Sequence, residues 1–319
     1  MKIVDVFIKI NDFTNHKKIL FLNKLKFYSI VRFLNRNVAY FILRFFYFLT
    51  SRNKQYSLGG GRSCNVIVSL TSFPARLEDL NLTLETILRQ DLQPNRILVY
   101  LSSDQISSLN LLPLRLSKLT KRGVEYIFVE GDIKSHKKYY YSLKDFPNNP
   151  ILTIDDDLLY DSKMLNRLYS AYLKDPSIIY CHYGYTITYN PLNKIESYRD
   201  WVMNKSFADA GLFNFFGSGG GTLFPPGTLH PEVFNIEVVK EICFNADDVW
   251  LNAMSRLVKT KVCQLRPSSI LFIPNSNLVS LKTINLAQNQ NDVQIKNVSE
   301  YCLEKFGVDP FSYDYLLEV

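Results

Sequence analysis

Several patterns that identify common protein classes are missing from this sequence. It has five cysteines and no C-x-x-C pair of the kind found in zinc ribbons and redox sites. It contains no G-x-x-x-x-G-K-[ST] phosphate loop, and no dinucleotide-binding G-x-G-x-x-G follows its first predicted strand. The odd number and wide scatter of the cysteines favour a reducing compartment, where such residues mainly fill the core. They are Cys64, Cys181, Cys243, Cys263 and Cys302.

Long apolar runs and secretory signals are missing as well. A bilayer-spanning helix needs roughly 18 to 20 apolar residues, and the uncharged runs of the N-terminal region are far shorter. Asp5 and Asp12 lie where a signal peptide would have its basic and apolar regions, and no small-residue cleavage site follows them. We therefore expect neither a transmembrane helix nor a secretory signal.

The positive charge of the chain is confined to one end. The 319 residues have a formal net charge of +7, but residues 1–58 alone hold 11 Lys and Arg against 2 Asp, and the remainder holds 26 basic against 28 acidic residues. This segment is also rich in aromatic residues, which favours interfacial helices on an anionic cytoplasmic membrane surface. The alternative is that ordinary helices pack on the rest of the protein. Without a nucleic-acid-binding motif, we expect no nucleic-acid partner.

After a linker with the sequence SLGGGRS, strands and helices alternate. This order predicts an α/β fold with a doubly wound, mostly parallel sheet, whose ligands bind beyond the carboxyl ends of the strands. We expect a catalytic domain at 64–275, preceded by the basic helical segment 1–58 and followed by an extension at 276–319. The expected strands are 64–70, 94–103, 124–130 and one that ends before Asp155, and the expected helices are 77–90 and 135–146, with a partly helical stretch before the third strand.

The stretch PILTIDDDLLY places three aspartates, Asp155, Asp156 and Asp157, at the end of a predicted central strand. Clustered carboxylates repel one another unless solvent or a cation compensates the charge. A solvated turn is one interpretation. The position at the ligand-binding edge favours another, a site for a hard divalent cation. If the strand geometry persists, Asp155 and Asp157 lie on the same side and Asp156 points elsewhere.

The order of these segments resembles the GT-A-fold glycosyltransferases of the family 2 type, and more closely bacterial enzymes of capsule and lipopolysaccharide loci. The resemblance covers residues 64–275 and rests on SLTSFPAR at 69–76, KSHKK at 134–138, TIDDD at 153–157 and NADDVWL at 245–251. It implies a GT-A, Rossmann-like, mixed and mostly parallel sheet flanked by helices. It also implies a nucleotide-sugar donor.

By this resemblance, Asp155 lies near the ribose and the metal, and Asp157 is a direct ligand of Mn²⁺ or Mg²⁺. The nucleotide-sugar-binding residues that it implies are Thr71, Ser72, Arg76, Asp132, Lys138, Asp155, Asp156, Gly220 and Gly221. Simpler interpretations stay open: a strand-to-helix turn after the first strand, a solvated lysine face on helix 135–146, and a flexible loop or β-bulge at the glycine-rich stretch 214–229.

The resemblance also implies that Asp248 is the general base of an inverting transfer, with Asp247 beside it. The alternative is that both acidic residues complement the dipole of a helix that Asn245 caps. The histidines and tryptophans are weaker signals: we expect His136 at the surface, structural roles for His182 and His230, and packing roles for Trp201 and Trp250. The alternatives are that His182 lines the acceptor side, that His230 is a further metal ligand as in some GT-A enzymes, and that the tryptophans stack on sugar rings.

The sequence therefore predicts a metal-dependent glycosyltransferase that moves a sugar from a nucleotide-diphosphate donor, such as a UDP-sugar, to a glycan or lipid-linked acceptor at the inner face of the cytoplasmic membrane. Two alternatives remain. A sugar-phosphate nucleotidyltransferase would carry a G-x-G-T-R-type loop where this chain has SLTSFPAR. A non-catalytic membrane-peripheral scaffold would not need both aspartate sets.

Overall fold

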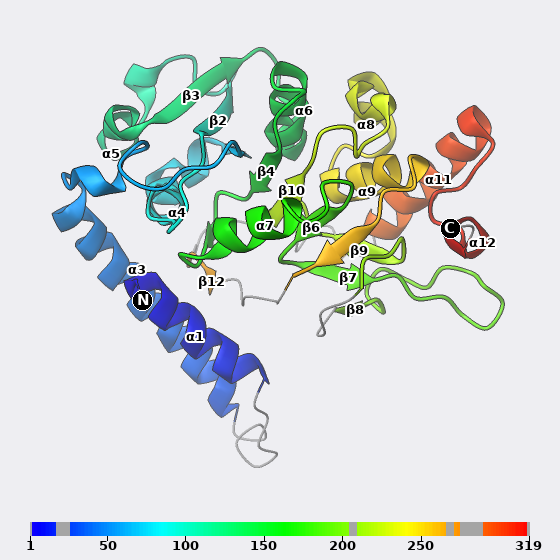
Figure 1. Cartoon of the computed structure of the whole chain (residues 1–319), viewed down its shortest axis with the longest axis horizontal. Helices are drawn as coiled ribbons and strands as arrows, with labels where there is room; N and C mark the ends of the chain where they lie inside the picture. Colours follow the sequence, from blue (N-terminus) through cyan, green and yellow to red (C-terminus); the bar gives the residue numbers. More distant parts are fainter. Residues whose placement is uncertain (1, 17–25, 204–208, 266–270, 275–289, 318–319) are drawn as a thin grey trace.

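The computed structural model describes residues 2–16, 26–203, 209–265, 271–274 and 290–317 (Figure 1). Within these residues the main sheet has seven strands: β1 (Ile67–Thr71), β2 (Arg96–Ser102), β3 (Val124–Val129), β4 (Ile151–Ile154), β6 (Ile179–Cys181), β10 (Gly220–Phe224) and β11 (Val262–Gln264). Their order is β11-β6-β10-β4-β1-β2-β3. Strand β10 runs antiparallel to β4 and β6, and the other neighbours pair in parallel. The predicted mixed, mostly parallel α/β fold is thus confirmed.

Helices cover both faces of this sheet, as a largely parallel sheet requires. One face is covered by α4 (Leu77–Leu88), α5 (Leu114–Ser117) and α7 (Met164–Tyr172), and the other by α6 (Lys137–Asp145), α8 (Ile236–Ile242) and α9 (Asp247–Leu257). Successive residues of a strand serve opposite faces. In β1, Val68 and Leu70 join the core under α4, whereas Ile67 joins the cluster under α6.

Smaller elements complete the body. They are a two-stranded sheet of β5 (Leu158–Leu159) and β12 (Leu271–Phe272), a three-stranded sheet of β7 (Gly184–Thr186), β8 (Val202–Met203) and β9 (Asn214–Phe216), and the C-terminal helices α11 (Gln290–Phe306) and α12 (Tyr313–Leu317). Short 3₁₀ helices lie at Lys54–Tyr56, Pro74–Arg76, Leu109–Leu111, Lys118–Arg122, Lys134–His136 and Pro231–Phe234. Ile295, Val298 and Cys302 of α11 are buried in the same core as α9. The C-terminal segment therefore belongs to the body of the protein.

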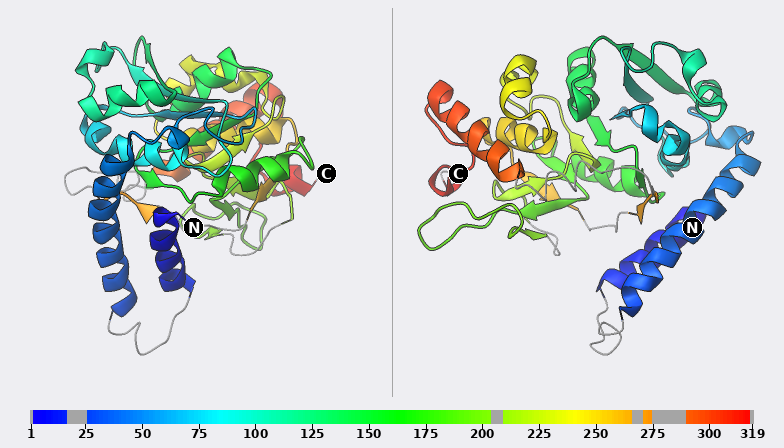
Figure 2. Two further views of the ribbon diagram at one scale, coloured as in Figure 1. Left: turned by 60° about the vertical axis from the view of Figure 1, so that its left-hand side comes forward. Right: turned by 180° about the vertical axis from the view of Figure 1, so that it is seen from behind.

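The N-terminal segment forms two helices, α1 (Ile3–His16) and α3 (Phe27–Thr50), which lie side by side and project from the body (Figure 2). One face of this helical pair packs on the body, because Leu43 and Tyr47 share a buried cluster with Leu82 of α4. Asp5 fixes the start of α1, where its carboxylate accepts hydrogen bonds from the backbone N and the Oγ of Ser162, both at 2.8 Å. Part of the segment thus packs as ordinary helices.

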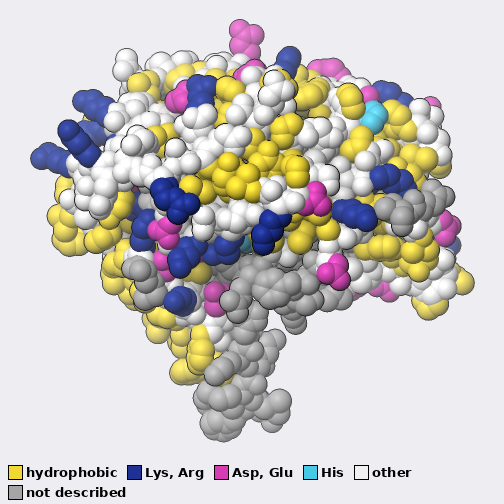
Figure 3. Space-filling model, viewed as in Figure 1, with side chains coloured by type: hydrophobic (Ala, Val, Ile, Leu, Met, Phe, Trp, Pro, Cys, Tyr) yellow, Lys and Arg dark blue, Asp and Glu magenta, His cyan; other side chains and the backbone are white. Residues whose placement is uncertain are grey.

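The opposite face of α3 carries large apolar side chains in contact with solvent. Hydrophobic side chains follow the edge of the molecule along this helix (Figure 3). The helix also holds Arg32, Arg36 and Arg44 and no acidic residue. No helix in the described part of the chain combines the length and hydropathy that crossing a bilayer requires. The exposed apolar face of α3 consists of Phe27, Ile30, Phe33, Leu34, Val38, Phe41, Ile42, Phe45, Phe48 and Leu49.

Candidate active site

The reversed strand β10 brings two distant parts of the sequence to one edge of the sheet. Strand β4 ends at Ile154, and β10 begins opposite it at Gly220 because the two strands are antiparallel. The backbone N of Asp155 donates a hydrogen bond to the carbonyl of Gly219 at 3.0 Å. The aspartate triplet and the glycine-rich stretch therefore face each other where the parallel strands end.

The triplet lies in a turn rather than in a strand, and this corrects one expectation. Since β4 stops at Ile154, alternation along a strand does not orient the three side chains. Asp156 is buried, and its Oδ2 accepts a hydrogen bond from Ser72 Oγ at 2.6 Å. Arg76 Nη1 lies 2.5 Å from Asp156 Oδ1 and 3.1 Å from Asp157 Oδ2. Asp156 and Asp157 thus share one guanidinium group, and Asp156 does not point away from its neighbour.

The second aspartate pair lies at the start of α9, and Ser218 holds both carboxylates. Ser218 Oγ lies 2.5 Å from Asp247 Oδ2 and 2.6 Å from Asp248 Oδ1, and Ser218 N donates to Asp248 Oδ1 at 3.2 Å. The predicted cap at Asn245 is wrong, because the helix is capped at Ala246 without a side-chain bond. Asn245 Oδ1 instead accepts a hydrogen bond from Lys134 Nζ at 2.7 Å.

Lys138 connects the two aspartate sets. Its Nζ lies 2.8 Å from Asp155 Oδ1 and 3.0 Å from Asp247 Oδ2, and its side chain is buried. Burial opposes the charged form, but Asp155 and Asp247 outweigh it and raise the pKa of Lys138. A solvated lysine face is therefore wrong for Lys137 and Lys138, which are both 2% exposed.

The expected surface position of His136 is also wrong. Its ring is fully buried, with Nδ1 2.9 Å from Tyr139 Oη and Nε2 3.1 Å from the carbonyl of Cys243. Burial lowers the pKa of His136 to about 4, so the ring is neutral at physiological pH. His136, Lys137 and Lys138 are consecutive and so point to different sides of the helical segment. Partners on each side bury them: the Cys243 carbonyl for His136, Asp132 for Lys137, and Asp155 with Asp247 for Lys138. Packing therefore decided their environment over their polarity.

The environments of Asp247 and Asp248 separate their proton affinities. Burial favours the neutral form of Asp247, but the charge of Lys138 and the hydrogen bond from Ser218 outweigh it and lower the pKa of this carboxyl. Burial and the neighbouring charge of Asp247 raise the pKa of Asp248 to about 7. Two carboxylates with diverging proton affinities are typical of sites that use one of them for proton transfer. Of the two carboxyls, Asp248 is therefore the one that exchanges a proton near neutral pH.

Other predicted binding residues lie around this edge with partners of their own. Thr71 Oγ1 donates to the carbonyl of Tyr100 at 2.8 Å. Asp132 follows β3, forms an ion pair with Lys137, and its Oδ2 accepts a hydrogen bond from Gln105 at 2.9 Å. Gly220 and Gly221 open β10 with a β-bulge, and Gly221 adopts a φ of 93°, which glycine accommodates readily.

Gly219 is in close contact with Asp155. A Cβ at this position would lie only 1.8 Å from Asp155 Oδ2 and 1.9 Å from Asp155 Cγ. Tyr160 supports the same contact, because its hydroxyl donates to the Gly219 carbonyl at 2.6 Å. Tyr160 and Ser218 are not among the site residues predicted from the sequence. Ser218 had one available signal, its place in FGSGGG, where small residues allow close approach to a functional group.

The charges of the site fit a divalent cation. Five aspartate carboxylates lie at this edge of the sheet. Among the described residues, Arg76 and Lys138 form ion pairs with them, and these two cations compensate only part of the negative charge of the five carboxylates. Within the described residues, no three His, Cys, Asp or Glu side chains are arranged to hold a metal by themselves. A pair of carboxylates with substrate phosphate oxygens is a common ligand set for Mg²⁺. The five carboxylates are those of Asp155, Asp156, Asp157, Asp247 and Asp248.

His182, His230 and Trp250 have structural contacts. His182 is 1% exposed, with Nε2 3.3 Å from the carbonyl of Met164. His230 Nδ1 accepts a hydrogen bond from the backbone N of Glu232 at 3.1 Å. Trp250 is fully buried, and its indole N–H donates to the carbonyl of Val233.

No protein-family model matches the chain, and no curated protein does. Similar solved structures include Staphylococcus aureus TarS 1–349 alone, with UDP and with UDP-GlcNAc, at TM-scores of 0.39, 0.41 and 0.40 and identities of 12%, 9% and 12%. These alignments cover 66%, 80% and 81% of this chain, and 59%, 75% and 76% of the TarS chain.

Two further structures have comparable similarity. The mannosyltransferase PcManGT from Pyrobaculum calidifontis, in complex with GDP-Man and Mn²⁺, has a TM-score of 0.44 at 13% identity and covers 88% of this chain and 78% of its own. UTP-bound UGPase from Acinetobacter baumannii has a TM-score of 0.38 at 10% identity and covers 81% and 99%. These likenesses concern the chain fold.

Proposed function

We propose that this protein is a metal-dependent glycosyltransferase that moves a sugar from a nucleotide-diphosphate sugar, such as a UDP-sugar, to a glycan or lipid-linked acceptor with inversion at the anomeric carbon. The observation that carries the proposal is the meeting of two aspartate sets through Lys138 at the carboxyl edge of the sheet. One set suits a cation and a diphosphate, and the other suits proton transfer.

In this proposal Asp155 and Asp157 hold Mn²⁺ or Mg²⁺. When bound, the cation supplies positive charge that stabilises the departing diphosphate. Arg76 keeps Asp157 in place from the loop after β1, and Ser72 holds the neighbouring Asp156. The buried Asp156 therefore shapes the loop that lies beside the donor.

Asp248 takes the proton of the acceptor hydroxyl. Ser218 orients its carboxylate, and the burial that raises its pKa makes it basic enough to accept a proton at neutral pH. Asp247 stays ionised through its contact with Lys138, and its negative charge strengthens the basicity of Asp248. A base on the face opposite the leaving group directs a single displacement, which inverts the anomeric centre.

The two alternatives account for fewer of these features. In a sugar-phosphate nucleotidyltransferase the attacking group is a phosphate oxygen that is already ionised, so a carboxyl tuned to accept a proton has no task. A non-catalytic scaffold gives no reason for five clustered carboxylates, whose mutual repulsion is unfavourable for folding. The different proton affinities of Asp247 and Asp248 favour glycosyl transfer over both.

The experiment is calorimetry of the full chain with UDP and Mn²⁺, followed by incubation with a panel of nucleotide sugars to detect slow donor hydrolysis. We expect Mn²⁺-dependent UDP binding that Asp157→Asn abolishes, because this change removes a ligand charge. Asp104→Asn, at an exposed aspartate outside the site, serves as the control. Unchanged Mn²⁺-dependent affinity in Asp157→Asn would contradict the metal assignment.

We further propose that the exposed apolar face of α3 lies on an anionic membrane surface, so that the enzyme works at the inner face of the cytoplasmic membrane. Apolar side chains on one face, with arginines and no acidic residue on the same helix, are typical of interfacial helices. The opposite face of α3 packs on the body, which would hold the active site at a fixed position relative to that surface.

A further inference from the structure

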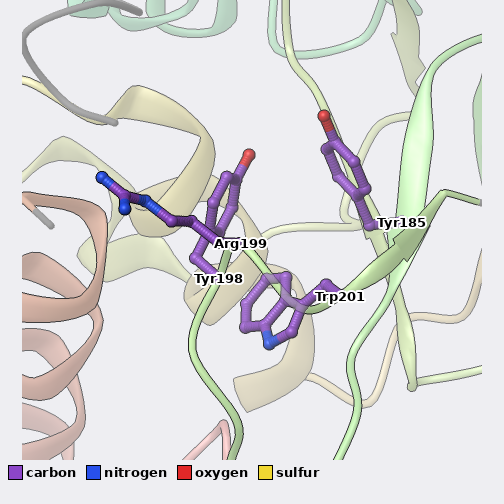
Figure 4. A pocket seen from close by; sticks show the side chains of 4 residues that line it. All are labelled: Tyr185, Tyr198, Arg199 and Trp201. Carbon is purple, nitrogen blue, oxygen red and sulfur yellow. The ribbon is translucent and has the colours of Figure 1, made fainter. Parts of the chain in front are cut away.

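A cavity of about 280 Å³ is lined by Tyr185, Tyr198, Arg199 and Trp201 (Figure 4). Tyr185 belongs to β7, and the other three residues follow it in the segment that leads to β8. Small-molecule sites typically measure roughly 300 to 1,000 Å³, so this cavity suits one sugar ring better than a whole nucleotide sugar. The sequence predicted a packing role for Trp201 and left stacking on a sugar ring as the alternative.

The aromatic walls are fixed by contacts within the protein. The ring centroids of Tyr185 and Tyr198 are 5.6 Å apart, and those of Tyr198 and Trp201 are 4.9 Å apart. The Trp201 indole N–H donates to the carbonyl of Glu196 at 3.0 Å, and the backbone N of Tyr198 donates to Asp292 at 2.7 Å. Figure 4 shows the hydroxyls of Tyr185 and Tyr198 pointing to the same side. The cavity therefore offers apolar ring faces and adjacent hydroxyl groups.

The cavity lies beside the proposed base. Tyr185 pairs with Phe215 of β9, and β9 leads directly to Ser218, whose hydroxyl lies 2.6 Å from Asp248. The rings of the wall are also within electrostatic reach of that carboxylate, because burial first and then Asp248 raise the pKa of Tyr185 and Tyr198. A ligand in the cavity would therefore lie next to Asp248.

Arg199 gives the rim of the cavity a positive charge. Its side chain is exposed, and within the described part of the chain it forms no ion pair or hydrogen bond. The other three lining residues are aromatic, so Arg199 is the side chain among the four that can attract an anion. A guanidinium group recognises carboxylate and phosphate groups well, because its planar donors match their oxygens.

We propose that this cavity binds the acceptor sugar and that the acceptor ring carries an acidic substituent, carboxylate or phosphate, that pairs with Arg199. This inference rests on the proposed function, since it places the acceptor hydroxyl near Asp248. The carbon-bound hydrogens of a sugar ring pack on aromatic faces, and its hydroxyls bond to the two tyrosines. The negative charge of the substituent selects acidic saccharides over neutral ones.

The experiment is a tryptophan fluorescence titration of the full chain with UDP and Mn²⁺ present. The probes are methyl β-D-glucopyranoside, its 6-phosphate and methyl β-D-glucuronide, which differ mainly in charge. Of the two tryptophans in the chain, Trp201 lines the cavity and Trp250 does not, so a saturable change in emission reports on Trp201, and Trp201→Phe should remove it. We expect at least one acidic probe to bind about three- to fivefold more tightly than the neutral one, as an exposed charge pair provides.

Arg199→Ala should remove this preference, so that the acidic probes bind no more tightly than the neutral one. Lys194→Ala is the matched control, because Lys194 is an exposed cation in the same segment that does not line the cavity. The result shows which anion is favoured: a preference for the glucuronide alone indicates a carboxylate, and one for the phosphate alone indicates a phosphate.

Equal affinities for all three probes, a preference that survives Arg199→Ala, or no saturable signal up to tens of millimolar would each overturn the inference. Calorimetry of the same samples with UDP and Mn²⁺ separates the two levels. If UDP binds and the saccharides do not, only the acceptor assignment fails. If Mn²⁺-dependent UDP binding is itself missing, the proposed function fails.

Discussion

Replacing Gly219 by alanine tests whether the contact between the glycine-rich stretch and the triplet serves the site. The new Cβ would lie 1.9 Å from Asp155 Cγ, so the carboxylate has to retreat by roughly 1.6 Å to reach ordinary van der Waals separation. That movement breaks its 2.8 Å contact with Lys138. The backbone of Gly219 has no left-handed φ, so the loss comes from the collision rather than from backbone strain.

The expected effect is large on ligand binding and small on stability. Displacing a proposed metal ligand should cost at least as much affinity as losing an outer-shell partner, about 10- to 100-fold, and we expect this loss in Mn²⁺-dependent UDP binding by calorimetry. Asp155 is partly exposed and Lys138 keeps Asp247, so the free energy of unfolding should fall by only about 1 to 2 kcal/mol. Denaturant unfolding measures that change.

Two comparisons make this prediction refutable. Gly211→Ala is the matched control, because its Cβ would meet nothing closer than 3.9 Å and should leave binding unchanged. In an Asp155→Ala background the collision partner is gone, so the stability cost of Gly219→Ala should disappear. Wild-type UDP affinity in Gly219→Ala, or a stability cost that persists in that background, would show that the reasoning is wrong.

Three further predictions follow from the site and from α3. Asp248→Asn should lower kcat by about 10² to 10⁴-fold in a transfer assay while calorimetric donor affinity stays near wild type, because general-base catalysis contributes about that much. The pKa of Asp248 is raised to about 7, so this carboxyl is protonated at acid pH and cannot accept a proton there. We therefore expect kcat to fall as the pH drops below 7 and to level off above it. A kcat that is independent of pH between 5 and 8 would contradict this. The double variant Phe41→Asp with Phe48→Asp should abolish cosedimentation with anionic vesicles. The control is Leu114→Asp, at a similarly exposed apolar residue outside α3, which should still cosediment. Equal binding by both variants would contradict the interfacial assignment.

The fold could be predicted because its signals are local. Strand 94–103 and helix 77–90 are observed as Arg96–Ser102 and Leu77–Leu88, and the triplet follows a central strand as its apolar run indicated. The resemblance implied a mixed sheet, but it did not say which strand runs antiparallel. That strand is β10. Its pairing with both β4 and β6 is a long-range choice, which composition and periodicity do not encode.

The site residues on sequence motifs were named in advance, whereas those that tertiary packing recruits were not. His136 was expected at the surface, where a short helical segment in isolation would expose it, but neighbouring elements bury its ring completely. Ser218 contacts both carboxylates of a helix thirty residues later in the chain, and no short-range pattern announces such a contact. The wall at Tyr198 and Trp201 likewise depends on a distant partner, Asp292.

If the proposed transfer holds, the position of Lys138 between Asp155 and Asp247 couples donor binding to acceptor binding. The ammonium group of Lys138 forms ion pairs with both carboxylates. A ligand that moves Asp155 away from Lys138 therefore leaves Lys138 paired with Asp247 alone. Any resulting change in the acceptor side must act back on the donor side with the same free energy. We therefore expect donor and acceptor affinities measured separately to differ from those in the ternary complex, each by the same factor.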